Sequence, residues 1–243
     1  PVGTGPYKLV EYEVGGKAVL DKNTEHEWWG EGAFLDRIEF IDYGTDGAAH
    51  VAAAEAEEVD MTYETIGEFV EIFQAIGWNQ SESISANTLV LRTNRLTEVE
   101  GMAPYADARV RRALALACDN SVLLELGYAG LGTLAENHHV CPIHPEYADI
   151  GAPERDIDAA RALMEEAGMM DFEHEVFSID DDWRKNTTDA MAAQLRDAGF
   201  NVKRTVLPGS TFWNDWNNYP FSSTDWGHRP LGVQVLTLAY KSG

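Results

Sequence analysis

The amino-acid sequence predicts an α/β fold in which mixed sheets are flanked by helices. Alternation of polar and apolar residues marks strands at 7–22 and 35–43, which is the pattern of a sheet with one covered face. Apolar residues recur with the 3.6-residue period of a helix in several later segments. Between residues 35 and 93 these patterns follow one another as strand, helix, strand, helix and strand, an order typical of an α/β layer.

A β-hairpin is expected at 7–22. Gly15 and Gly16 separate its two alternating runs, and glycine readily takes the positive φ that a two-residue hairpin turn requires. The elements expected after the hairpin are a strand at 35–43, a helix at 48–57, a short strand at 59–63, a helix at 66–76 and a strand at 83–93.

The segment from Pro104 to Asn120 gives the strongest helix signal in the chain. Its apolar residues fall at positions i, i+3, i+4 and i+7, which places them on one stripe. They are Val110, Ala113, Leu114 and Ala117. Asp107 is the expected N-cap, and the arginines of this helix are expected to face solvent or acidic neighbours.

The second half of the chain continues the α/β pattern. Asp156 is an expected N-cap, and Gly168 and Gly199 suit left-handed helix stops. The expected elements are helices at 121–128, 156–167 and 188–198 and strands at 173–179 and 201–207. Residues 212–230 mix aromatic rings with hydrogen-bonding side chains, a combination that favours a ligand cleft or a packed edge.

Composition excludes several classes of function. The 243 residues carry 41 acidic and 18 basic side chains, for a formal net charge of −23, which argues against a nucleic-acid partner and against an anionic membrane surface. The two cysteines, Cys118 and Cys141, exclude a disulfide-dense scaffold. The chain begins at Pro1 without an initiator methionine or a signal peptide, and we expect it to be an internal fragment of a longer protein.

Several motifs in fixed order resemble one protein family. They are Gly3 to Tyr7 (GTGPY), Asn23, Trp28-Trp29-Gly30, Asn94, and Pro104 to Asp119 with its pattern P-Y-x-D-x-R-V-R-x-A-L-x-x-A-x-D. Together they resemble the extracytoplasmic solute-binding proteins of peptide- and nickel-type ABC importers, known as family 5. The family's acidic G-E-V-D pattern is represented by Glu57 to Asp60, with glutamate in place of glycine.

The resemblance implies a two-lobed fold of the periplasmic-binding-protein type II class. Such a protein closes over a peptide or related small organic solute and presents it to the membrane permease of an ABC transporter, without catalysis and without a cofactor. It implies a periplasmic location, and a monomer is expected. Residues 1–92 are expected to form part of a discontinuous first lobe and residues 93–243 most of the second, with a crossing between lobes near 89–94.

The candidate ligand-binding residues lie at the expected carboxyl ends of strands, in segments 178–184 and 224–230, where open α/β sheets bind ligands. The resemblance assigns Trp226 to the cleft wall and places Tyr63 near the cleft. Where peptide binders of the family carry an acidic residue after this tryptophan, the chain has Gly227, His228 and Arg229.

This departure from the family affects the predicted ligand contact. A guanidinium at Arg229 suits an anion and repels an ammonium group, although an ordinary surface salt bridge is an equal alternative. Asp225 is a second candidate for an ammonium contact, but alternation along a strand points its side chain away from Trp226. Arg184 is a further candidate ligand-binding residue. Its guanidinium could instead balance the charges of Asp180, Asp181 and Asp182.

Two further interpretations belong to other functional classes. His138, His139, Cys141 and His144 are all residue types that bind zinc or nickel, so a stand-alone metal-binding domain is an alternative, although their spacing fits no zinc-finger pattern. A carboxylate-dependent hydrolase, with a pair such as Glu173 and Asp180, is a less favoured alternative because the chain has no HExxH, GxSxG, P-loop or GxGxxG pattern.

Overall fold

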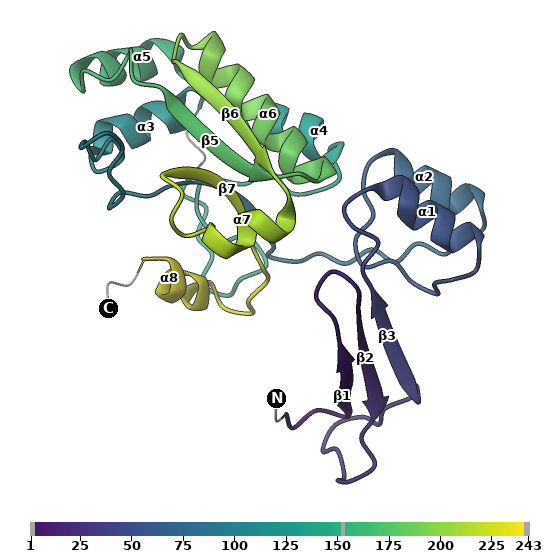
Figure 1. Cartoon of the computed structure of the whole chain (residues 1–243). Helices are drawn as coiled ribbons and strands as arrows, with labels where there is room; N and C mark the ends of the chain where they lie inside the picture. The colour runs from purple at the N-terminus through teal and green to yellow at the C-terminus, as the bar shows by residue number, and fades with distance from the viewer. Residues whose placement is uncertain (1–2, 152–153, 241–243) are drawn as a thin grey trace. The chain divides into compact units, whose positions relative to one another are not determined.

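The computed structural model describes residues 3–151 and 154–240, shown in Figure 1. The chain forms two compact units, Pro1–Thr62 and Tyr63–Gly243. Both units combine strands with helices, as the sequence predicts. In the described part of the chain, no helix is both long enough and apolar enough to cross a membrane.

The first unit contains an antiparallel sheet with the order β1-β2-β3, followed by one helix. Its elements are β1 (Tyr7–Tyr12), β2 (Lys17–Lys22), β3 (Arg37–Ile41) and α1 (Gly47–Glu55). The predicted hairpin is confirmed, but its loop is longer than two residues: Glu13 N donates to Lys17 O at 2.8 Å, and of the two glycines only Gly15 has a positive φ, +71°.

The strand predicted at 59–63 is wrong. The structure has no strand there, although the alternating sequence is compatible with one. The backbone N–H and C=O groups of a strand must form hydrogen bonds with a neighbouring strand. Neither described sheet supplies a neighbouring strand for this segment. Met61 is 76% exposed, so the segment has no covered face either.

The second unit is built on a mixed sheet with the order β4-β7-β5-β6. The strands are β4 (Thr88–Thr93), β5 (His174–Ile179), β6 (Val202–Leu207) and β7 (Phe221–Trp226). β5 is parallel to both β6 and β7, whereas β4 is antiparallel to β7. β4, near which we place a crossing between lobes, therefore pairs within the second unit.

Helices cover both faces of this sheet (Figure 1). The helices of the unit are α2 (Glu68–Ala75), α3 (Ala108–Leu116), α4 (Asn120–Tyr128), α5 (Ile157–Glu166), α6 (Asp182–Asp197), α7 (Gly209–Asp215) and α8 (Gly232–Tyr240). Val176 packs in a core with α3, α5 and α6. Its neighbour Phe177 stacks on Tyr219, which stacks on Phe212 of α7, so α7 lies on the opposite face.

The apolar stripe predicted for the segment 104–120 is confirmed. Val110, Ala113 and Ala117 are fully buried and Leu114 is 6% exposed. The predicted N-cap is confirmed as well, because the Asp107 side chain accepts a hydrogen bond from Arg109 N at 2.8 Å. This helix, α3, is therefore part of the scaffold of the second unit.

Other helix boundaries differ from the prediction. α5 is capped by Asp156 and followed by Gly168 at φ +66°, as expected. α6 begins at Asp182 instead of residue 188, because Asp181 serves as its N-cap. The sequence prediction did not include α7 or α8, both of which lie in the aromatic-rich C-terminal part.

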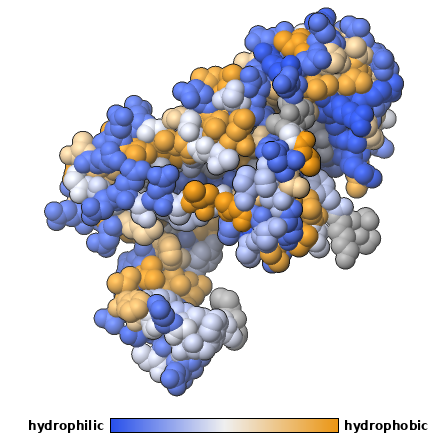
Figure 2. Space-filling view, turned by 180° about the vertical axis from the view of Figure 1, so that it is seen from behind, coloured by the Kyte–Doolittle hydropathy of each residue, from blue (hydrophilic) through white to orange (hydrophobic). Residues whose placement is uncertain are grey.

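The surface carries both acidic and apolar side chains. In Figure 2 the face over α5 and its surroundings is largely hydrophilic, whereas hydrophobic atoms are visible on the part formed by β1, β2 and β3. Tyr12 and Phe40 in these strands are 67% and 60% exposed. The hydrophilic face agrees with a net charge that favours solubility.

A buried histidine lies at the start of β5. His174 is fully buried, and its Nδ1 lies 3.2 Å from the Tyr105 hydroxyl. Phe172 packs against the same imidazole ring. Burial lowers the pKa of His174 from 6.5 to about 4, because a charged imidazolium in this apolar surrounding would lose its hydration.

We predict that this histidine makes the fold sensitive to acid. Above pH 6.5 the imidazole is neutral in the folded and the unfolded chain. As the pH falls from 6.5 to about 4, only the unfolded chain gains the proton, so the free energy of unfolding decreases by about 3 kcal/mol. Denaturant unfolding of His174→Phe over this pH range should lack that part of the decrease. An unchanged pH dependence in the variant would contradict the assignment.

Candidate functional site

The carboxyl ends of β5 and β7 lie beside each other in the second unit, because these two strands are parallel neighbours. β5 leads through Asp180 and Asp181 into α6, and β7 ends with Asp225 and Trp226. The structure thus brings together the two segments, 178–184 and 224–230, that the sequence marks as the candidate binding region. This is the edge at which open α/β sheets bind ligands.

An ion-paired cluster joins the two segments. Arg184 Nε lies 2.8 Å from Asp225 Oδ1, and the same guanidinium pairs with the Asp181 carboxylate. These three side chains are only 10–17% exposed. Arg184 also lies over the ring of Trp183, with its guanidinium carbon 4.2 Å from the ring centroid. One planar guanidinium therefore serves two carboxylates and an aromatic face, a geometry that lysine could not reproduce.

Burial and neighbouring charges shift the pKa values of this cluster in opposing directions. Burial would lower the pKa of Arg184, but its hydrogen bond to Asp225 and the charge of Asp181 outweigh that effect and raise it. For Asp181 burial is the stronger influence and raises the pKa of the carboxyl, although Arg184 opposes the shift. A single cation thus compensates the two aspartates incompletely.

Two residues that the sequence analysis missed complete the cluster. Burial raises the pKa of the Glu64 carboxyl, with the Arg184 charge opposing and the Asp225 charge adding to the shift. Tyr128 donates to Glu64 Oε1 at 3.4 Å, and burial raises the pKa of this tyrosine to about 12. Tyr128 packs edge-on against Trp183. No local sequence motif marks Glu64 or Tyr128. They lie far from 178–184 along the chain and reach the cluster only in the folded structure.

The remaining predicted residues lie outside the ion-paired cluster. Trp226 packs edge-on against Trp216 and His139, with ring centroids at 6.2 Å and 5.5 Å. His228 Nδ1 accepts from Ala86 N at 3.1 Å. The Arg229 guanidinium donates to the carbonyl oxygens of Gly227 and His228. Tyr63 is 95% exposed. The ligand-binding roles of these residues stay predictions.

The four candidate metal ligands do not converge on one point. His138 Nε2 lies 3.1 Å from a Glu136 carboxylate oxygen, and His139 is packed between two aromatic rings. Both ring nitrogens of His144 have backbone partners. Among the described residues there is no group of three or more potential ligands that could hold a metal ion.

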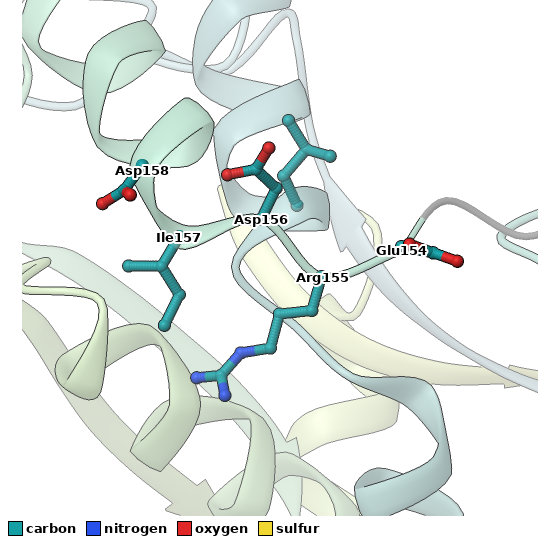
Figure 3. A pocket seen from close by; sticks show the side chains of 6 residues that line it. Glu154, Arg155, Asp156, Ile157 and Asp158 are labelled. Carbon is teal, nitrogen blue, oxygen red and sulfur yellow. The ribbon is translucent and has the colours of Figure 1, made fainter.

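An open hollow of about 780 Å³ lies at the start of α5 (Figure 3). It is lined by Leu116, Glu154, Arg155, Asp156, Ile157 and Asp158. Figure 3 shows that the side chains of Glu154, Arg155 and Asp158 point in different directions. Arg155 Nε donates to Ala117 O at 3.0 Å and Asp156 caps α5. These polar groups stabilise the fold and do not surround a common ligand position.

Comparison with known proteins identifies the family. The sequence profile of the bacterial extracellular solute-binding proteins, family 5 (middle region), matches residues 1–242. The chain belongs to this family. The resemblance carried by the motifs of the first half is therefore confirmed, and membership in a family of solute-binding proteins agrees with the prediction of binding without catalysis.

Individual relatives of this family 5 chain differ in their ligands. Heme-binding protein A of Haemophilus influenzae is 28% identical over 169 residues, which are 69% of this chain and 29% of that protein. The dipeptide-binding protein of Escherichia coli is 25% identical over 181 residues, 74% of this chain and 32% of that protein.

A solved structure confirms the fold. NikA from Staphylococcus aureus, in complex with Ni(L-His)2, matches with a TM-score of 0.80 at 19% identity, over 100% of this chain and 52% of that chain. At this identity the match shows the fold alone. The chain thus spans about a third of the curated relatives and about half of the solved structure.

We predict that Arg184 contributes strongly to the stability of the second unit. Arg184→Gln leaves Asp181 and Asp225 without their cation in a site where all three side chains are at most 17% exposed, so unfolding should become easier by about 2–4 kcal/mol. The measurement is denaturant unfolding at pH 7. Arg229→Gln is the matched control, because the hydrogen bonds of this exposed guanidinium within the described residues go to carbonyl oxygens of its own loop. Equal effects of the two substitutions would refute the assignment.

Proposed function

We propose that the full-length protein captures a peptide or a related small organic solute for uptake by an ABC importer. The observation that carries this proposal is the cluster of Asp181, Arg184 and Asp225 at the carboxyl ends of β5 and β7. Membership in the family of extracellular solute-binding proteins supports it, and so does the relative that is named a dipeptide-binding protein.

The charges of the cluster favour a solute with an ammonium group. Glu64, Asp181 and Asp225 carry three potential negative charges against the single positive charge of Arg184, and burial raises the pKa of two of these carboxyls. A bound ammonium group would supply a further positive charge and would oppose the rise in the pKa of both carboxyls.

The mechanism we propose is closure of two lobes over the solute. Residues 1–92 would belong to the first, discontinuous lobe and residues 93–243 to most of the second, and the closed monomer would dock on the membrane permease outside the cytoplasm. Each lobe supplies part of the binding surface, so the present chain is proposed to hold one wall of the site. The metal-binding alternative gains no support, because His138, His139 and His144 each contact a group outside the four, and the described residues contain no group of three or more potential ligands that could hold a metal ion.

We predict that the full-length protein co-purifies with a peptide or a small organic acid bearing an amine. Native mass spectrometry, followed by release and identification of the small molecule, measures this. Calorimetry with the identified molecule should then show weak or absent binding by the 243-residue chain, because a binding surface shared by two lobes is incomplete in it.

Three results would each contradict part of this proposal. Co-purified heme or a nickel complex would refute the solute class. A released turnover product would refute binding without catalysis. Micromolar binding by the 243-residue chain would refute the division of the site between two lobes.

A further inference from the structure

The histidine-rich segment 138–147 packs against the residues that follow β7. The imidazole of His139, which is 3% exposed, contacts the Trp226 ring. Gly232 N donates to a Glu146 carboxylate oxygen at 3.2 Å. Gly232 also approaches Val140 so closely that an added Cβ would lie 2.7 Å from Val140 Cγ2. The two segments thus meet at both ends of the loop from Gly227 to Leu231.

His144 supplies the central contact between these segments. It is 3% exposed. Its Nε2 lies 3.0 Å from Arg229 O, and its Nδ1 lies 2.9 Å from Cys141 N. A carbonyl oxygen can only accept and a backbone N–H can only donate. Nε2 therefore carries the proton and Nδ1 is the acceptor, so the two backbone partners fix one tautomer.

We propose that His144 is a positioning residue that holds the loop following Trp226 in place. Its Nδ1 accepts from Cys141 N and orders its own turn, while its Nε2–H crosses to the carbonyl of Arg229. Within the same loop, His228 Nδ1 accepts from Ala86 N at 3.1 Å. The loop is thereby held between two segments that are distant from it in the sequence.

This assignment gives the histidine cluster a role that replaces metal binding. A metal ion at His144 would need a ring nitrogen, and both nitrogens already have backbone partners. The relevance of the loop to solute capture rests on the proposed function, because the loop directly follows Trp226. The hydrogen-bond geometry itself involves no solute and can be tested without one.

Two substitutions separate the two hydrogen bonds. An asparagine side chain can place its oxygen near the position of the histidine Nδ1, and a glutamine can place its amide nitrogen near the position of Nε2. His144→Asn should keep the local bond to Cys141 N and lose the bond to Arg229 O. His144→Gln should do the reverse.

The test is amide hydrogen exchange of the 243-residue chain measured by NMR at neutral pH. We expect His144→Asn to raise the exchange rate of the Gly232 amide about tenfold, because one hydrogen bond that docks the two segments is lost, while Cys141 keeps its protection. His144→Gln should restore the Gly232 amide to near the wild-type rate and deprotect Cys141. Thermal unfolding of both variants checks that the fold is retained.

A second measurement holds even if neither variant folds. Ring nitrogen chemical shifts of wild-type His144 should show a protonated Nε2 and an unprotonated Nδ1. The opposite tautomer, or equal Gly232 exchange in the two folded variants, would overturn the proposal. Failure of the full-length protein to bind any solute would refute the proposed function and leave this result unaffected.

Discussion

The pairing of β7 between β4 and β5 is the constraint on which the second unit depends. β7 comes late in the chain, yet it pairs antiparallel with β4 over Phe221–Trp226 and lies parallel to β5. It is also polar: Ser222, Ser223 and Thr224 are all at most 1% exposed. Backbone pairing on both sides satisfies the peptide groups that burial would otherwise penalise. It also sets the carboxyl ends of β5 and β7 side by side.

That placement explains the chemistry of the candidate site. Alternation along β7 directs Asp225 toward α6, where Arg184 meets it, while Trp226 contacts Trp216 and His139. Because Asp181 both caps α6 and pairs with Arg184, the start of the helix is tied to the end of the sheet. The cluster is thus a structural clamp with an excess of acidic groups. We propose that this clamp forms one wall of a binding site for a cationic group.

The sequence predicted elements with strong local patterns and missed features set by distant contacts. The stripe of Val110 and Ala113 and the cap at Asp107 follow from spacing alone, and all three are observed. The absence of a strand at 59–63 depends on pairing partners that periodicity does not contain. The early start of α6 is a local feature, since Asp181 caps the helix, but the apolar period of the helix does not mark it. The candidate site shows the same division. The segments around Arg184 and Trp226 were predicted from their position after strands, whereas the contributions of Glu64 and Tyr128 arise only from folding.

The central claim is that the carboxyl ends of β5 and β7 form one wall of the solute site. It is tested most directly by hydrogen exchange of the full-length protein, measured with and without the solute that co-purifies with it. We predict that the solute protects residues 180–184 and 224–229 and leaves the exchange of residues 154–158, beside the hollow at α5, unchanged. Protection confined to residues 154–158, or absent from both predicted segments, would contradict the account.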